Sequence, residues 1–423
     1  MYRNIHDTKM VLIINELQKY ELYNLSPIFT LLLYMYQKFQ ANQLFNGTEL
    51  LDGGSQVLIT KQDGTVEGIV PLSEAGEDIQ IMKGILTPGF VNAHCHLELS
   101  HMKGMIPPHT GLQEFVKQIV VLRQVEPEAI QEAIVTAENE MVSNGIVAVG
   151  DISNTLDTLE QKAKHHLAYY SFVELYDLDP IRAHDKIIAG IEIQKQFQEN
   201  CVRASLVPHA PYSVSPRLWT LLSEHFESHT ISMHNQETPA ENEFFKTKTG
   251  SFLGMYERTK VNLDFFEATG LSSLQSVLPV LKNATTSILV HNSFTNADDI
   301  DAVKNKMPNT FWCLCPNANQ YIEQTMPPIE LLRSKNVNIC VGTDSYASNW
   351  SLNILDELKT IQQKFAAIPL AEMLQWATLN GARALQMDKH LGGFEKGKKP
   401  GIVLIKGADE LNGLSSASSQ RIL

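Results

Sequence analysis

Apolar strand-like runs alternate with amphipathic helical stretches along most of this chain, and this alternation restricts its fold more than any other feature. An opening apolar run at residues 84–96 is followed by seven further predicted strands. Helical stretches such as Pro127–Asn144 and Pro216–His229 separate the strands, and the helical run Leu370–Leu385 follows the last one. Eight such units in succession predict an α/β fold, a (β/α)8 TIM barrel. The seven later strands are expected at Ile146–Ser153, Ala168–Tyr176, Val202–Ala210, Thr230–Gln236, Ser287–Asn292, Thr310–Pro316 and Asn338–Asp344.

Both flanks of the predicted barrel are rich in short strands. Before the barrel, turn signals such as Asn46-Gly47 and Asp63-Gly64 break the chain into short runs, a pattern typical of small antiparallel strands. A turn and a further strand follow Leu391. We therefore expect one small accessory β-sandwich built from both chain ends. The predicted domains are an N-terminal appendage at 1–34, the first part of the β domain at 35–83, the barrel at 84–388, and the second part of the β domain at 389–423.

Composition excludes several classes of function. The formal net charge is −13, which argues against nucleic acid as a partner, because phosphate binding needs a basic surface. The sequence has no run of about 18 apolar residues, so no membrane span is expected. The five cysteines lie in apolar, strand-like runs and are interpreted as buried free thiols of a cytoplasmic protein. The expected partner is a small-molecule substrate, and homo-oligomerisation is left open.

The opening strand ends in a His-x-His pattern. Side chains on a strand alternate between its faces, so His94 and His96 point the same way and Cys95 points the other way. Two neighbouring imidazoles make half of a transition-metal site. Taken alone, the pattern is as consistent with two histidines that merely end a strand.

Further polar residues end the later strands. Strand ends of this kind form the catalytic face of a barrel. A lone histidine at such a place is more often structural than a ligand, but a whole set in one register favours a functional site. The set comprises His209, His234, Glu237, His291 and Asp344, together with the first pair.

Three imidazoles and one carboxylate suit zinc or ferrous iron, and a water would complete the shell. The ion lowers the pKa of that water towards neutrality. Glu237 lies three residues past His234, where a carboxylate can act as a base on the water without binding the metal. A solvated loop acid is the alternative for Glu237. His291 could hold the water or a developing oxyanion.

The ordered set of motifs resembles the amidohydrolase superfamily. The motifs are Pro88-Gly-Phe-Val-Asn-Ala-His-Cys-His96, His234-x-x-Glu237, His291 and Gly342-Thr-Asp344, and the resemblance covers about residues 36–405. It is closer to the aminohydrolase branch, which includes adenine-nucleoside, guanine and cytosine deaminases and triazine chlorohydrolases.

The resemblance implies a role for each matching residue. His94, His96, His234 and Asp344 match the metal ligands, with Asp344 also assisting catalysis. Glu237 matches the proton shuttle, His291 the histidine beside the hydrolytic water, and His209 a substrate contact. One divalent ion is expected, with zinc favoured and iron the alternative. Binuclear relatives carry a carboxylated lysine on an early-middle strand, whereas Ala168–Tyr176 has no lysine and offers Glu174.

The segment after the histidine pair bears on the substrate. His96-Leu-Glu-Leu-Ser100 is similar to deaminases acting on aminodeoxyfutalosine, which makes Glu98 a candidate substrate contact, or else a structural acid facing a loop. The leading hypothesis is a hydrolytic deaminase that releases ammonia from an amino-substituted heterocycle, a purine nucleoside above all. The rivals are a hydrolase that expels chloride or cleaves an amide or imine, and a barrel that serves as a scaffold without catalysis.

Overall fold

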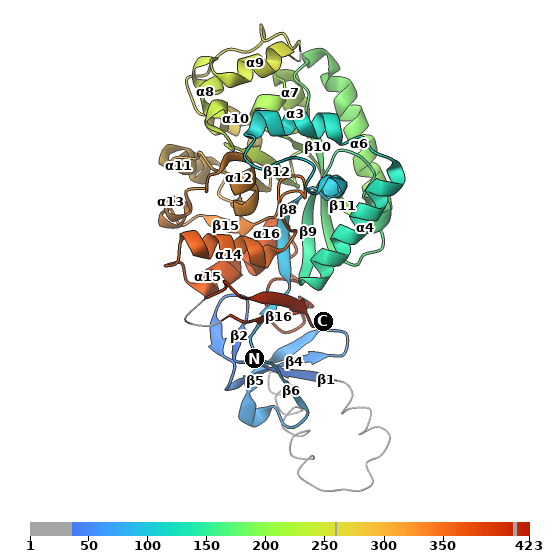
Figure 1. The fold of residues 1–423 in the computed structure, drawn as a ribbon, viewed down its shortest axis with the longest axis vertical. Helices are drawn as coiled ribbons and strands as arrows, with labels where there is room; N and C mark the ends of the chain where they lie inside the picture. The colour runs from blue at the N-terminus through green and yellow to red at the C-terminus, as the bar shows by residue number, and fades with distance from the viewer. Residues whose placement is uncertain (1–35, 259, 409–412) are drawn as a thin grey trace.

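The computed structural model describes residues 36–258, 260–408 and 413–423. The predicted N-terminal appendage, residues 1–34, therefore lies outside the described residues. Figure 1 shows a large region of strands and helices with a smaller, strand-rich region at one end, where strands from early and late parts of the chain lie side by side.

The large region contains two four-stranded sheets in which every pairing is parallel. Each sheet follows the order of the strands along the chain. The first sheet consists of β8 (Phe90–Cys95), β9 (Ile146–Ser153), β10 (Ala168–Leu175) and β11 (Arg203–Pro208). The second consists of β12 (Thr230–Asn235), β13 (Thr286–His291), β14 (Thr310–Leu314) and β15 (Asn338–Val341).

Backbone hydrogen bonds connect the outer strands of the two sheets near their carboxyl ends. The N–H of His234 donates to the carbonyl oxygen of His209 at 2.9 Å, which joins β12 to the residue after β11. The N–H of Asp344 donates to the carbonyl oxygen of His94 at 3.1 Å, which joins the segment after β15 to β8. The carboxyl ends of both sheets are thereby brought to a common region.

Helices connect the strands and cover them. Proline occupies the first turn of α4, α7, α8 and α12, a position where its missing N–H costs no hydrogen bond. The described helices of this region are η2 (Leu97–Met102), α3 (Leu112–Leu122), α4 (Pro127–Ser143), α5 (Leu159–Lys162), η3 (Pro180–Arg182), α6 (Ala183–Glu199), η4 (Pro211–Ser213), α7 (Pro216–Ser223), α8 (Pro239–Thr247), α9 (Ser251–Arg258), α10 (Ser273–Leu281), α11 (Ala297–Lys306), α12 (Pro316–Glu323), α13 (Ile329–Ser334), α14 (Ile354–Lys364), α15 (Leu370–Gln375), η5 (Trp376–Asn380) and α16 (Gly381–Ala384).

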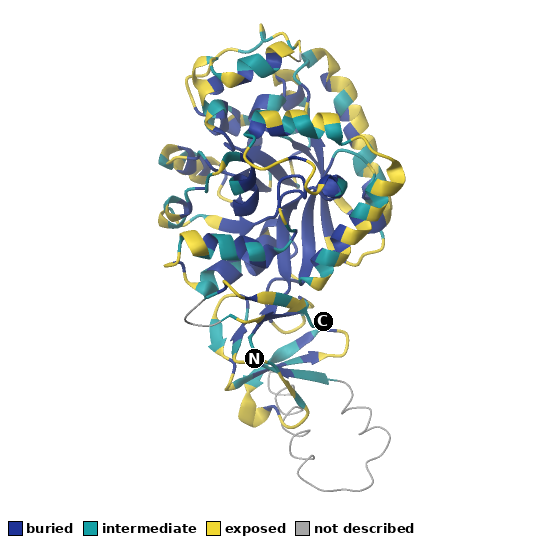
Figure 2. Ribbon diagram, in the orientation of Figure 1, coloured by how far each residue is buried: buried dark blue, intermediate teal, exposed yellow. Residues whose placement is uncertain are grey.

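Burial explains the apolar character of the parallel strands. Every residue of β8, β9, β12, β13 and β14 is buried, and Figure 2 shows these strands in dark blue beneath helices with exposed outer faces. Parallel strands covered on both sides read as near-continuous apolar runs, which is why they were visible in the sequence. The seven later strands begin and end within three residues of their predicted bounds, whereas the opening run at 84–96 forms two strands, β7 (Ile85–Pro88) and β8, which belong to different sheets.

The smaller region combines two further sheets. One has the order β5-β4-β1-β6, from β1 (Tyr36–Gln40), β4 (Gln56–Lys61), β5 (Val66–Pro71) and β6 (Ile79–Ile81), with η1 (Leu72–Glu74) after β5. The other has the order β17-β16-β7-β2-β3, from β2 (Gln43–Phe45), β3 (Leu50–Asp52), β7 (Ile85–Pro88), β16 (Ile402–Lys406) and β17 (Ser418–Arg421). In this five-stranded sheet, β7 pairs with β16 on one side and with β2 on the other.

Two sequence predictions differ from the structure. Strands before residue 84 were expected to be antiparallel, and β1 with β4, β4 with β5 and β2 with β3 are, but β1 runs parallel to β6. The prediction of buried cysteines is wrong for Cys201, which is exposed in the turn between α6 and β11 with a φ of 59°. The other four cysteines are buried.

Among the described residues, every helix is too short or too polar to cross a lipid bilayer.

Candidate metal centre

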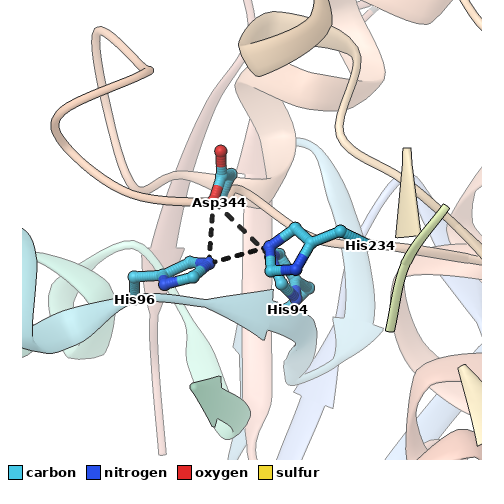
Figure 3. Close-up of side chains that lie close together, drawn as sticks. All are labelled: His94, His96, His234 and Asp344. Atoms are coloured by element: carbon cyan, nitrogen blue, oxygen red, sulfur yellow. Dashed lines mark hydrogen bonds and ion pairs between the residues drawn. The ribbon is translucent and has the colours of Figure 1, made fainter. Parts of the chain in front are cut away.

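Four side chains from three strand ends meet at one point. His94 lies on β8 and His96 directly after it, His234 lies on β12, and Asp344 lies three residues past the end of β15. Figure 3 shows the three imidazoles and the carboxylate pointing towards one another. The alternation of faces along β8 accounts for the common direction of His94 and His96, as the sequence predicted.

The donor atoms of this cluster are close enough to share one ion. Nε2 of His96 lies 3.2 Å from Nε2 of His234, and Oδ1 of Asp344 lies 3.3 Å from Nε2 of His96 and 3.5 Å from Nε2 of His94. One ligand atom from each residue lies within 4.8 Å of all the others. Ligands around a zinc ion at about 2.0–2.2 Å are separated by such distances.

The protonation state of the cluster suits a cation. Burial is the main cause that lowers the pKa of His96 to about 3, and it holds the pKa of His234 well below its usual value, so both imidazoles are neutral near pH 7. Burial opposes ionisation of Asp344, but the imidazoles around it, those of His94, His96 and His291, hold its pKa well below its usual range. Neutral imidazoles and an ionised carboxylate are the forms that bind metals.

The hydrogen bonding of His234 and His94 leaves ring nitrogens available to a metal. Nδ1 of His234 lies 3.0 Å from the carbonyl oxygen of His209, and a carbonyl can only accept, so Nδ1 carries the proton and Nε2 offers its lone pair. Both ring nitrogens of His94 are buried without a hydrogen-bond partner among the described residues. An orphaned imidazole is costly unless a ligand occupies it, and a divalent cation satisfies this donor set.

The backbone at two of these strand ends is left-handed. Asp344 has a φ of 58°, and its carboxylate accepts a hydrogen bond from Ser348 Oγ at 2.6 Å. His291, at the end of β13, has a φ of 71°. Non-glycine residues in this conformation are uncommon and gather at functional sites. Ser348 was missed by sequence reasoning, because no spacing rule links it to Asp344.

Glu237 and His291 lie beside one another next to the cluster. Oε2 of Glu237 is 3.7 Å from Nε2 of His291, and both side chains are buried. Burial raises the pKa of Glu237 well above its usual value. Nδ1 of His291 lies 3.3 Å from Oδ1 of Asn319, which leaves its Nε2 towards Glu237.

A buried network holds the loop that carries Glu237. Gln236 has a φ of 46° and donates from Nε2 to Asp299 at 2.9 Å and to Asn242 at 3.0 Å. Its Oε1 accepts from Thr295 Oγ1 at 2.6 Å. These bonds fix the turn between β12 and α8, so the position of Glu237 depends on residues that the sequence motif did not reveal.

His209 and Glu174 form the opposite flank of the cluster. The ring centre of His209 lies 4.7 Å from that of His234, and Oε1 of Glu174 lies 3.4 Å from Nδ1 of His234. A ring nitrogen of His209, one of His234 and a carboxylate oxygen of Glu174 all lie within 4.8 Å of one another. Burial lowers the pKa of His209 to about 4 and raises that of Glu174 to about 7.

Glu98 is buried in η2 and lies outside the cluster of metal-binding side chains. Its Oε1 accepts from Arg123 at 3.1 Å, and its Oε2 accepts from the N–H groups of Asn154 at 2.9 Å and Thr155 at 3.1 Å. Burial, as the largest cause, raises the pKa of Glu98 to about 7. Both of its oxygens therefore have protein donors.

Gly342 of the Gly-Thr-Asp motif leaves room for His94. A Cβ at this position would lie 2.8 Å from the Cβ, the N and the O of His94, and backbone atoms cannot give way as a flexible side chain can. We expect Gly342→Ala to lower the free energy of unfolding by about 1–3 kcal/mol and to weaken metal binding. Denaturant unfolding and metal analysis measure both effects. Gly68→Ala is the control, since nothing lies within 4 Å of its Cβ, and equal behaviour of the two variants would contradict the expectation.

The chain is similar to known proteins in both sequence and fold. Residues 85–421 match the sequence model of the Amidohydrolase family. The chain is 26% identical over 328 residues to an adenosine deaminase of Helicobacter pylori, a match that covers 74% of this chain and 77% of the relative. The structure of Helicobacter pylori aminofutalosine deaminase in complex with methylthio-coformycin superimposes with a TM-score of 0.75 at 23% identity, covering 92% of this chain and 100% of that chain. A zinc-bound adenosine deaminase from Xanthomonas campestris superimposes with a TM-score of 0.68 at 20% identity, covering 91% and 90%.

Proposed function

The chain belongs to the amidohydrolase family, and we propose that it is a metal-dependent deaminase that releases ammonia from the adenine ring of a purine nucleoside. The observation that carries the proposal is the buried cluster of three neutral imidazoles and an ionised carboxylate with a second carboxyl group, Glu237, beside it. The deaminase relative supports the choice of an amino-bearing ring.

We assign the four cluster residues, His94, His96, His234 and Asp344, as ligands of one divalent ion, with zinc favoured over iron. When bound, such an ion acidifies a water so that hydroxide is available near neutral pH. The choice of one ion rests on β10, which has no lysine and carries Glu174 instead. The zinc-bound neighbour supports the choice of metal.

The chain's own residues handle the protons. Glu237 accepts a proton as water oxygen bonds to the amine-bearing ring carbon, and it then delivers a proton to the departing amino group, which leaves as ammonia. Burial raises the pKa of Glu237, which suits a group that must hold a proton during the reaction. His291, 3.7 Å from Glu237, donates or accepts a hydrogen bond at the attacking oxygen. Asp344, besides holding the metal, also assists catalysis.

Substrate contacts lie on the opposite flank. We assign His209 a direct contact with the substrate, since its ring flanks His234. Glu98 also stays a predicted contributor to substrate binding. Because Arg123, Asn154 and Thr155 already occupy its oxygens, its contribution goes through these neighbours.

Ammonia release from a nucleoside panel tests the function. The purified protein, loaded with zinc, should release ammonia from at least one of adenosine, 5′-deoxyadenosine, 5′-methylthioadenosine and aminodeoxyfutalosine. The control is the same protein treated with a chelator, which should be inactive. Chloride release from a chlorotriazine, without ammonia from any adenine nucleoside, would favour the rival hydrolase. Absence of both products and of bound metal would favour the non-catalytic scaffold.

The same proposal includes the finer architecture. Backbone hydrogen bonds join the two parallel sheets at both pairs of outer strands, β11 with β12 and β15 with β8. This supports a closed (β/α)8 barrel at about residues 84–388. The five-stranded sheet that pairs β7 with β2 and β16 supports an accessory β domain assembled from residues 35–83 and 389–423. We also propose that the protein is located in the cytoplasm.

A further inference from the structure

One carboxylate oxygen at the edge of the cluster has no hydrogen-bond partner in the part of the chain that the structure describes. Glu174 is buried, with 5% of its surface exposed, and its Oε1 has no hydrogen-bond partner among the described residues. Its other oxygen, Oε2, accepts from Nδ2 of Asn154 at 3.0 Å. A buried carboxylate oxygen without a donor is costly, so a donor absent from the chain is expected there.

The neighbouring histidine does not supply that donor. Nδ1 of His234 is 3.4 Å from Oε1 of Glu174 but 3.0 Å from the carbonyl oxygen of His209, so its single proton is directed to the carbonyl. The guanidinium of Arg123, the nearest cation of this network, is engaged by Glu98 at 3.1 Å. Oε1 therefore remains a free acceptor.

A second free acceptor lies beside it. Nδ1 of His209 is 2.7 Å from Oγ of Ser213, and that hydroxyl donates its one proton to the carbonyl oxygen of Ala210 at 3.1 Å. In this arrangement of protons, Nδ1 of His209 donates to Oγ of Ser213 and Nε2 has a free lone pair. Glu174 and His209 thus offer two acceptors at neighbouring positions, suited to a ligand with two adjacent donors.

The flank on which these acceptors lie indicates which part of a substrate they meet. Of the reactive groups, Glu237 follows β12 and His291 ends β13, whereas Glu174 lies near the end of β10 and His209 follows β11. His234 lies between the flanks, with Nε2 towards the metal ligands and Nδ1 towards Glu174. The reacting ring carbon belongs beside Glu237, so Glu174 meets a more distant part of the molecule.

We propose that Glu174 is a specificity-determining residue whose Oε1 accepts a hydrogen bond from a sugar hydroxyl of the nucleoside, with His209 receiving the adjacent hydroxyl. This inference rests on the proposed function, since it deepens the account of the same site. Glu98 acts one bond farther away: it holds the N–H of Asn154, whose side chain in turn holds Oε2 of Glu174.

The replacement Glu174→Gln removes the charged acceptor from the proposed contact. Because Asn154 donates to one oxygen, the amide of the new side chain must place its oxygen there and its NH2 where Oε1 was, which turns an acceptor into a donor. The wild type should lose kcat/KM by about 10- to 100-fold when adenosine is replaced by its 2′-deoxy or 3′-deoxy analogue, the size expected for a hydrogen bond to a charged group. In Glu174→Gln the amide can donate to the hydroxyl oxygen but carries no charge, so removal of the same hydroxyl should lower kcat/KM by less than about tenfold, and by a smaller factor than in the wild type.

Glu98→Gln is the matched control, a carboxyl-to-amide change in the same network without a free acceptor. It should lower kcat/KM for adenosine and for its deoxy analogues by the same factor. All proteins are assayed at the same pH, and the metal content of each is measured. An unchanged preference for the hydroxyl in Glu174→Gln would overturn the inference, as would loss of bound metal in that variant. A wild type that deaminates no adenine nucleoside would instead overturn the proposed function.

Discussion

Replacement of Glu237 by glutamine is expected to lower kcat by at least about 10²-fold, the usual contribution of a positioned proton-transfer group. Glutamine preserves the size and much of the hydrogen-bonding shape of the side chain, but it cannot take a proton from water. The four cluster residues are unchanged, so the variant should retain its metal. Steady-state ammonia release and elemental analysis of the same preparation measure the two quantities.

A neighbouring carboxyl provides the control for this experiment. Glu243 lies exposed on α8, the helix that follows Glu237, and Glu243→Gln should turn over near the wild-type rate. Near-wild-type turnover of Glu237→Gln would refute the shuttle role. Loss of metal from Glu237→Gln would mean that Glu237 is a ligand.

Removal of the His234 imidazole should abolish metal binding and activity together. His234→Ala deletes one of the four donors, and its Nε2 lies within 3.2 Å of the His96 nitrogen. Without the ion, the pKa of water returns to its much higher bulk value, and hydroxide is no longer available as a nucleophile at neutral pH. Metal content should fall from about one ion per chain towards zero, and ammonia release should fall below detection.

Zinc add-back distinguishes a lost ligand from a lost fold. Chelated wild-type protein should regain activity when zinc is returned, whereas His234→Ala should not. His184→Ala, an exposed position on α6, controls for the removal of an imidazole in general. Full metal content in His234→Ala would contradict its assignment as a ligand.

The strands of the large region could be predicted because burial on both faces gives parallel strands a continuous apolar pattern. The meeting of His94, His96, His234 and Asp344 could be anticipated from their common strand-end register and from the motifs of the resemblance. The partners of these residues could not. Ser348 reaches Asp344 through a left-handed turn, which depends on loop geometry that no spacing encodes.

Long-range side-chain pairing also escaped prediction. Asn154 follows β9 and contacts both Glu98 and Glu174, 56 and 20 residues away in the sequence. The sequence offered Glu174 only as a replacement for a lysine, whereas the structure shows that one of its oxygens accepts from Asn154 and the other has no hydrogen-bond partner among residues 36–258, 260–408 and 413–423. Such a distinction depends on the packing of three strand ends at once.

The pairing of β7 with β16 has a consequence for the order in which the protein can fold. On the ribosome, β7 emerges about 300 residues before its partner, so one edge of that strand waits unpaired through most of synthesis. β7 leads through one residue into β8, which carries His94. The strand at the centre of the site is therefore anchored on this side only when nearly the whole chain has been made. Such late, non-local pairing is slow, and an unpaired edge invites association with other chains meanwhile.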